Sequence, residues 1–318
     1  VCAPLLLGMT GFWGSALVYE ACLSAETIFA IGTRFKEADC SSWYPGYTFN
    51  IPGSKIIHVD IEPSEIGRNY PTEIGVVADA KAALTVLNRV ATKRFPRGRA
   101  ANPMTAKISE FRKTFAASNV ENATSSAFPM MPERILADVR RALPADGILT
   151  TDVGWNKNGV GQQFDILTPG SILTPGGFAT MGFGPPAAIG AKLAAPERTV
   201  LSLVGDGGFG QNPAMLATAV ELGLGIVWLV MNNNAFGTIA GLQKAHYGLT
   251  YGTTFPGEAG APANGPDYAL IAQAYGATGV RVESANALLP ALEAAFAMNR
   301  PVVLDVAMIN NPTPTTGH

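Results

Sequence analysis

Short, continuously apolar runs that end in small or polar residues are the feature that most constrains the fold of this 318-residue chain. Two of them, residues 199–205 and 225–231, are rich in Val, Leu and Ile and show no alternation of polar and apolar positions. Strands that are buried on both faces, as in parallel sheets, have this pattern. The runs that we predict as strands are residues 27–32, 55–61, 147–152, 199–205, 225–231 and 301–307.

Ala-rich stretches between these runs predict helices, at residues 132–142, 186–194, 213–223 and 287–297. Three of them begin with Pro, which is common in the first turn of a helix. Alternating strands and helices predict an α/β fold with two open parallel sheets of the doubly wound type. A basic stretch with Pro and Gly near residues 92–106 reads as a surface boundary. We therefore expect a partial first domain at 1–92, a linker at 93–126 and a second domain at 127–318.

Composition argues against several classes of partner. The chain holds 22 Lys and Arg against 24 Asp and Glu, so no basic excess is available for nucleic acid. Cys2, Cys22 and Cys40 form no CxxC pair, which argues against a disulfide framework or a zinc site and favours a cytoplasmic setting. No apolar run reaches the 18 residues that a membrane helix needs, and no signal peptide is visible at the start.

The residues that carry chemistry follow two neighbouring predicted strands. One strand ends in Gly205-Asp206-Gly207-Gly208, and the next is followed by Asn233, 27 positions after Asp206. Ligands of open α/β sheets bind at the carboxyl ends of strands, where glycines let the backbone approach a phosphate. A carboxylate beside a phosphate requires a bridging cation such as Mg²⁺ or Ca²⁺. We predict an oxygen-only metal site from the Asp206 carboxylate, the Asn233 side-chain carbonyl and a loop backbone carbonyl.

Other phosphate-binding motifs fit less well. Gly-Asp-Gly alone is usually a turn and Asn-Asn alone usually caps a loop, so the prediction depends on their spacing and on the strand before each. The chain has no GxxxxGK[ST] sequence, which excludes a P-loop. Gly182-Phe183-Gly184 fits the Rossmann fingerprint poorly because no suitable strand precedes it.

The spaced Gly-Asp-Gly and Asn-Asn pair resembles the signature of thiamine diphosphate (ThDP) enzymes. The longer match is to the acetolactate (acetohydroxyacid) synthase-like family. Residues 174–190 resemble the segment that enters that family's pyrimidine-facing helix, and residues 151–158 resemble its phosphate-side strand end. Four earlier segments, residues 7–11, 30–35, 58–67 and 77–81, resemble its central domain.

The resemblance implies ThDP and Mg²⁺ as cofactors and a 2-oxo acid such as pyruvate as the substrate of a carboligase or decarboxylase. Asp206 and Asn233 would bind the metal through their side chains, and Ala235 through its carbonyl. Gly207 and Gly208 would face the diphosphate, the Ala179 carbonyl would accept from the 4′-amino group, and Met181 would lie under the cofactor. The full set of implied cofactor contacts is Asn156, Ala179, Met181, Gly205, Gly207, Gly208, Phe236 and Gly237.

The family also has a pyrimidine-binding domain, which contains its catalytic Glu and which we expect this chain to lack. No catalytic residue is therefore assigned, and the chain alone is expected to be inactive. The resemblance implies a homodimer or homotetramer, or a partner subunit that supplies the missing domain. His246 could act as an acid or base, although a solvated role is favoured, and His58 is predicted to be a core residue. Residues 247–255 are predicted to form a mobile loop over the site.

Four positions depart from the synthases: Ala38, Asn156, Met215 and Leu242. Leu242 stands where the synthases have a Trp that shapes the second-substrate pocket, so a ThDP-dependent lyase or hydrolase with a different acyl donor stays open. Ala38 replaces an Arg and argues against FAD, although Gly32, Arg34 and Asp60 could support a flavin or ADP site. A non-catalytic nucleotide- or flavin-binding regulatory module is the alternative from another class.

Overall fold

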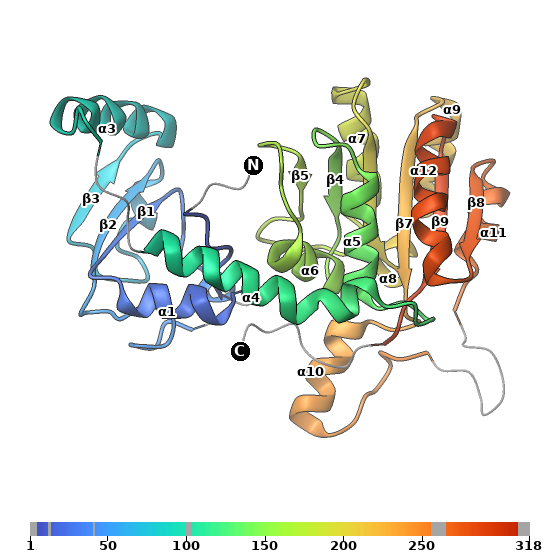
Figure 1. Cartoon of the computed structure of the whole chain (residues 1–318), viewed down its shortest axis with the longest axis horizontal. Coiled ribbons are helices and arrows are strands. Elements are labelled where there is room, and N and C mark those ends of the chain that lie inside the picture. Colours follow the sequence, from blue (N-terminus) through green and yellow to red (C-terminus); the bar gives the residue numbers. More distant parts are fainter. Residues whose placement is uncertain (1–4, 12–13, 41, 99–103, 256–264, 311–318) are drawn as a thin grey trace. The chain divides into compact units, whose positions relative to one another are not determined.

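The computed structural model describes residues 5–11, 14–40, 42–98, 104–255 and 265–310. The chain divides into two compact units, and the division falls between Thr114 and Phe115, inside helix α4 (Met104–Thr124) (Figure 1). Each unit contains its own parallel sheet. No helix in the described ranges combines the length and the apolar character that crossing a membrane requires.

The N-terminal unit is built on a three-stranded parallel sheet in the order β1-β2-β3. Its elements are α1 (Ala16–Ser24), β1 (Thr27–Ile31), α2 (Glu37–Cys40), β2 (Lys55–Asp60), the 3₁₀ helix η2 (Pro63–Glu65), β3 (Ile74–Val77) and α3 (Ala80–Arg94). His58 on β2 is 2% exposed, its Nε2 lies 2.9 Å from the Thr33 carbonyl oxygen, and its ring packs edge-on against Phe35. The prediction that His58 is a core residue is confirmed.

The C-terminal unit is built on a six-stranded parallel sheet in the order β5-β4-β6-β7-β9-β8. The strands are β4 (Ile148–Thr151), β5 (Ile172–Leu173), β6 (Val200–Gly205), β7 (Ile226–Asn232), β8 (Thr278–Val282) and β9 (Val302–Ala307). The helices are α5 (Pro132–Ala142), α6 (Trp155–Gln163), α7 (Gly184–Ala194), α8 (Asp206–Phe209), α9 (Met215–Glu221), α10 (Gly237–Tyr247), α11 (Tyr268–Ala274), η3 (Ala285–Ala287) and α12 (Leu288–Met298).

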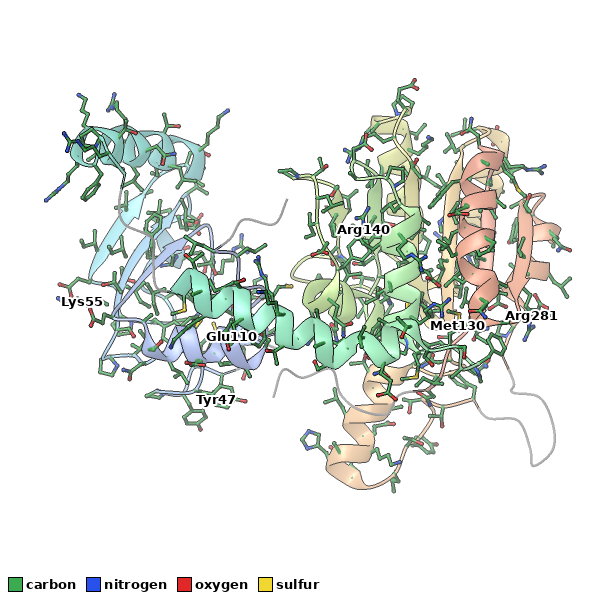
Figure 2. The ribbon with its side chains drawn as sticks, in the orientation of Figure 1. Tyr47, Lys55, Glu110, Met130, Arg140 and Arg281 are labelled. Atoms are coloured by element: carbon green, nitrogen blue, oxygen red, sulfur yellow. The ribbon has the colours of Figure 1, made fainter. Side chains whose placement is uncertain are left out.

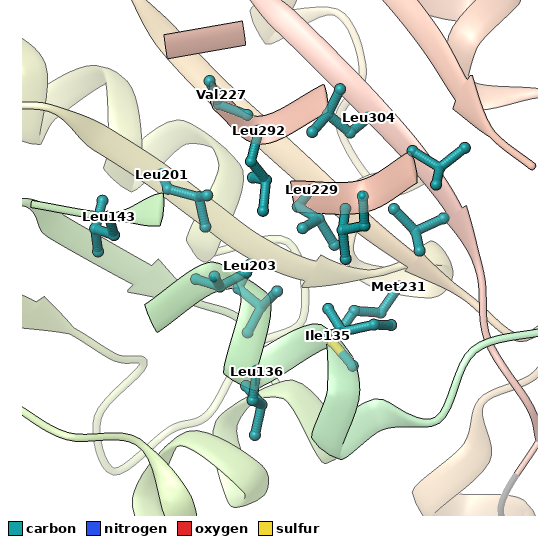
Figure 3. Close-up of a cluster of buried hydrophobic side chains, with 14 of the residues drawn as sticks. Ile135, Leu136, Leu143, Leu201, Leu203, Val227, Leu229, Met231, Leu292 and Leu304 are labelled. Atoms are coloured by element: carbon teal, nitrogen blue, oxygen red, sulfur yellow. The ribbon is translucent and has the colours of Figure 1, made fainter. Parts of the chain in front are cut away.

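Helices cover both faces of this sheet, which explains the apolar runs. Alternate residues of one strand enter different cores, so that Leu201 and Leu203 of β6 pack with α5 and α12, whereas Val200 and Val204 pack with α7 and α9. Figure 3 shows the first of these cores. Both faces of β6 and β7 must therefore be apolar. At the edge of the first core, Arg140 of α5 (labelled in Figure 2) lies over the ring of Phe164, 4.9 Å from its centroid.

The predicted α/β class with parallel sheets is confirmed, and all six predicted strands are present within one residue at each end. The sequence reasoning missed β3, β5 and β8, and the helices α1, α2, α3, α4, α6, α8, α10 and α11. The stretch predicted as a linker contains the whole of α4, and the helix expected from Pro213 is preceded by the short helix α8, which begins at Asp206. The domain limits themselves stay a prediction.

Candidate functional site

The order of strands in the six-stranded sheet reverses direction between β4 and β6, which makes this a topological switch point. The chain runs outward from β4 to the edge strand β5 and then returns to the other side of β4 to form β6 and β7. In open α/β sheets, ligands bind in the crevice outside the carboxyl ends of the strands at such a point. Asp152 directly follows β4 and Asp206 directly follows β6, so both carboxylates lie at the edge where a ligand is expected.

Asp206 is a buried carboxylate held by backbone donors. Asp206 is 7% exposed. Oδ1 accepts from the N–H of Gly207 at 2.7 Å, and Oδ2 accepts from the N–H of Ala235 at 3.2 Å. Burial raises the pKa of Asp206 to about 6, against the opposing effect of these hydrogen bonds. Within the described residues no Lys, Arg or His forms an ion pair with it, so a bound cation would supply the missing positive charge.

The other two predicted metal ligands, Asn233 and Ala235, follow β7. Gly205 pairs with Met231 in the ladder, which brings the ends of β6 and β7 side by side. Ala235 is 3% exposed and touches the Asp206 carboxylate through its N–H. The Asn233 amide nitrogen donates to Asn310 Oδ1 at 3.3 Å, and this bond leaves the Asn233 carbonyl oxygen as the atom that could bind a metal.

This donor set fits Mg²⁺ by its chemistry. Carboxylate, amide and backbone carbonyl oxygens are the ligands that hard divalent cations prefer, and Mg²⁺ is usually bound by one or two carboxylates together with substrate phosphates. In the part of the chain that the structure describes, no group of three or more His, Cys, Asp or Glu side chains is placed to hold a metal. A site here therefore depends on one carboxylate and neutral oxygens, with a phosphate as a further ligand.

The glycines after Asp206 are packed closely against other predicted site residues. A Cβ atom on Gly207 would lie 2.5 Å from Cε1 of Phe236 and 3.0 Å from Cε of Met181. The structure thus brings Gly207, Met181 and Phe236 together from three separate segments. Gly237 packs on Asn233, because a Cβ on Gly237 would lie 2.8 Å from Asn233 Nδ2. A Cβ at either glycine would collide with these side chains, so the close packing of the three segments requires glycine at both positions.

Asn156 is engaged by its own loop. Its Oδ1 accepts from the N–H of Asp152 at 2.9 Å, and its Nδ2 donates to the Val153 carbonyl at 3.2 Å. The same Nδ2 lies 3.8 Å from where a Cβ would stand on Gly205, so Asn156 spans the ends of β4 and β6. Both of its polar groups already have backbone partners. Its contact with a diphosphate stays a prediction.

Ala179 lies in the loop before α7 and has an unusual backbone. Its φ is +49°, a region that L-residues other than Asn and Asp rarely adopt, and Gly182 follows at +87°. The N–H of Ala179 donates to the Gly176 carbonyl at 3.0 Å, which closes a tight turn. Strained backbone of this kind persists only where the surroundings hold it, and it is concentrated at functional sites.

Sequence reasoning missed a buried polar network behind the metal loop. Asp305, in the middle of β9 and 2% exposed, accepts from Asn232 Nδ2 at 3.0 Å and from the N–H of Tyr268 at 3.3 Å. Asn232 Oδ1 accepts from the N–H of Asn234, and the Tyr268 hydroxyl donates to the Asp206 carbonyl at 3.0 Å. The signal was an Asp inside an otherwise apolar strand. Asp152 was missed as well, although it follows a buried strand as Asp206 does.

His246 and Leu242 both lie on α10. His246 is exposed in the last turn of this helix, next to Tyr247, and Leu242 is half-buried. Part of the predicted loop over the site pairs with the segment after β7: the N–H of Phe236 donates to the Thr253 carbonyl at 2.8 Å.

Comparison with known proteins finds two domains in the chain, as the resemblance implied. The family model for the C-terminal TPP-binding domain of thiamine pyrophosphate enzymes matches residues 152–306, and the model for their central domain matches residues 3–87. The chain is 32% identical over 311 residues to a probable acetolactate synthase large subunit of Methanocaldococcus jannaschii, which covers 96% of this chain and 50% of that protein. It is 31% identical over 314 residues to a putative thiamine pyrophosphate-containing protein, YdaP, of Bacillus subtilis (99% and 51%). It is 28% identical over 305 residues to the acetolactate synthase large subunit of Haemophilus influenzae (94% and 50%). The chain spans about half the length of the curated relatives it matches.

Proposed function

Because the chain belongs to the thiamine pyrophosphate enzyme family, we propose that it forms the metal- and diphosphate-binding half of an acetolactate synthase-like enzyme that acts on a 2-oxo acid such as pyruvate. The observation that carries this proposal is the buried Asp206 carboxylate at the switch point, which has no cationic partner among the described residues and is joined by hydrogen bond to the segment after β7. Thiamine pyrophosphate and thiamine diphosphate are two names for the same cofactor.

In this proposal the chain's own residues bind and orient the cofactor. The Asp206 carboxylate, the Asn233 carbonyl oxygen and the Ala235 carbonyl would hold Mg²⁺. Gly205, Gly207 and Gly208 let the backbone approach the phosphates. When bound, the cofactor supplies carbanion and electron-sink chemistry that side chains lack. Of the other implied contacts, Asn156, Met181 and Phe236 lie against the glycines at the end of β6, and Gly237 packs on Asn233. The contact through the Ala179 carbonyl stays a prediction.

The finer parts of the proposal concern the assembly of the enzyme and the pyrimidine-binding half of its active site. We propose that the catalytic Glu lies in a pyrimidine-binding domain outside this chain, so the chain alone is inactive. Several of the relatives are named large subunits, which supports an assembly with a second kind of subunit in addition to a homodimer or homotetramer. The same proposal includes a partial central domain at 1–92, a linker at 93–126 and a cytoplasmic setting. Whether FAD binds through Gly32, Arg34 and Asp60 stays open.

The test is a calorimetric titration of the chain with ThDP, with and without Mg²⁺. We expect binding that requires the metal. Asp206→Asn should weaken it by about 100-fold or more, because even residues that only support a metal ligand typically contribute 10- to 100-fold. Asp138→Asn is the matched control, since Asp138 is also fully buried in this unit but pairs with Arg134 and Arg141 on α5.

Metal-independent binding, or normal binding by folded Asp206→Asn, would contradict the assignment of Asp206. If the wild-type chain bound nothing, a version extended at its N-terminus would be titrated next. Failure of the extended protein would leave the regulatory alternative as the better explanation.

A second enzymatic candidate is a ThDP-dependent lyase or hydrolase with a different acyl donor. The residue that favours it is Leu242 on α10, where the synthases have Trp. Incubating the complete enzyme with pyruvate separates the two candidates. Acetolactate as the product supports the synthase, whereas acetaldehyde or no turnover of pyruvate supports the alternative.

A further inference from the structure

The carboxylate of Asp152 is fully buried at the carboxyl end of β4 and is held by backbone donors. Oδ1 accepts from the N–H of Val153 at 2.7 Å and from that of Gly182 at 3.1 Å, and Oδ2 accepts from the N–H of Gly184 at 2.8 Å. None of the ion pairs found among the described residues includes it. A buried charge is costly unless it is compensated, so these N–H groups stabilise it and it in turn holds the loop from which two of them come.

The same carboxylate touches the backbone of the second strand end. A Cβ atom on Gly208 would lie 2.7 Å from Asp152 Oδ1 and 2.9 Å from its Cγ, closer than carbon and oxygen atoms pack. The Gly208 backbone therefore lies directly on the carboxylate. Asp152 is thus in contact both with the loop that ends at Gly184 and with the glycine turn that follows Asp206.

The loop that Asp152 holds contains two residues with an unfavourable backbone conformation. Ala179 and Gly182 both have positive φ, at +49° and +87°. Between them, Met181 reaches across to the glycine turn, with its Cε 3.0 Å from where a Cβ would stand on Gly207. Hydrogen bonds at Gly182 and Gly184 fix the backbone immediately after Met181. They act together with the hydrogen bond from the Thr150 hydroxyl to the Gly184 carbonyl and with the packing of Gly182 on Gln211.

We infer that Asp152 is a positioning residue, whose carboxylate joins the Ala179–Met181 loop to the Gly207–Gly208 turn so that a ligand is held at two separated points. The inference rests on the proposed function for the identity of that ligand. Its diphosphate end would meet the glycine turn and Asp206, and the rest of the molecule would meet the loop. Asp152 would then contribute to binding of the whole cofactor but little to binding of a diphosphate group alone.

The experiment compares two probes on the folded chain, Mg²⁺ with ThDP and Mg²⁺ with inorganic pyrophosphate. Asp152→Asn keeps the shape of the side chain but places an NH₂ group against a backbone N–H, so at least one hydrogen bond to the loop is lost. We expect the Kd for ThDP to rise about tenfold and the Kd for pyrophosphate to change less than about twofold. Asp138→Asn, which removes another fully buried carboxylate of the same unit, should leave both values unchanged. A loss shared equally by both probes, or no loss, would overturn the inference, because a general structural defect does not distinguish the two ligands.

Amide hydrogen exchange supplies a readout that needs no ligand. The N–H groups of Gly182 and Gly184 should exchange slowly in the wild-type chain and about tenfold or more faster in Asp152→Asn, while α5 stays unchanged. If Asp152→Asn does not fold, the wild-type measurement alone decides, since amides at Gly182 and Gly184 that exchange as fast as exposed loop amides would refute their bonds to Asp152. If neither the wild-type chain nor the version extended at its N-terminus binds either probe, the proposed function fails, and the exchange experiment still tests the role of Asp152 in holding the loop.

Discussion

Adding one methyl group at Gly207 tests how closely the glycine turn is packed. Gly207 lies in α8 and has an ordinary helical backbone without positive φ, so Ala can adopt its conformation. A Cβ there would lie 2.5 Å from Cε1 and 2.7 Å from Cδ1 of Phe236, where carbon atoms normally stay about 3.5–4.0 Å apart. The ring would have to move by about 1 Å. It is packed edge-on against Phe255, with centroids 5.2 Å apart, which limits that movement.

The magnitude follows from two opposing effects. Overpacking of this kind costs about 1–3 kcal/mol, whereas Ala in place of Gly in a helix contributes up to about 1 kcal/mol of stability. We expect Gly207→Ala to lower the free energy of unfolding by about 1–2 kcal/mol, which corresponds to a fall in Tm of roughly 2–8 °C for a unit of this size. The half-buried position of Phe236 places the value toward the lower end of this range.

The assay is urea and thermal unfolding of the chain without ligand, followed by circular dichroism. Gly205→Ala is the matched control two residues earlier, because the nearest atom to its added Cβ is Asn156 Nδ2 at 3.8 Å, an ordinary contact. Its stability should stay within about 0.5 kcal/mol of the wild type. If Gly207→Ala were as stable as Gly205→Ala, the close packing of Gly207 on Phe236 and Met181 would be refuted.

Two further predictions concern residues away from the site. Gly190→Ala should raise the free energy of unfolding by about 0.5–1 kcal/mol in the same assay, because Gly190 lies inside α7, where a Cβ would meet no atom within 4 Å; a decrease would show that the position is more crowded than the structure indicates. Burial raises the pKa of the Cys22 thiol to about 11, so at pH 8 folded Cys22 should react with iodoacetamide roughly 100-fold more slowly than in urea, as followed by mass spectrometry of its peptide. Since the folded pKa is the higher one, the contribution of this thiol to stability is complete below its ordinary pKa and is lost as the pH rises toward 11. Equal alkylation rates with and without urea would show that Cys22 is not buried.

The central strands could be predicted from the sequence because buried strands consist of consecutive apolar residues. In β2, β4, β6, β7 and β9 most residues are buried, whereas β1 is apolar although only Ala30 of its five residues is buried. β3, β5 and β8 are not buried in this way. β3 is exposed at all four positions, β5 has only two residues, and β8 is an edge strand that includes the exposed Arg281. Strands at an edge are recognised by their neighbours rather than by their composition.

Helices without a buried face were missed for a related reason. None of the described residues of α3 is buried, and α4 has one buried residue, Ile108, in 21. The apolar residues Leu84, Leu87 and Val90 of α3 recur at helical spacing but are exposed. The basic residues of the 93–126 stretch suggested a linker instead of α4. α8 was missed because two of its four residues, Gly207 and Gly208, are poor helix formers; in the structure Tyr268 and Phe236 contact this turn.

The sequence by itself determined which residues stand at the strand ends. A carboxylate after β6 and an amide after β7, each preceded by a buried run, follow from local pattern alone, because a strand and the residues that end it are neighbours in the chain. The tertiary structure decided which of these groups meet. Asp152 reaches Gly182 and Gly184 across about 30 residues, and it reaches Gly208 only because β6 returns to the open side of β4. Contacts of this kind depend on strand order and on the packing of both sheet faces, which no local run of residues encodes.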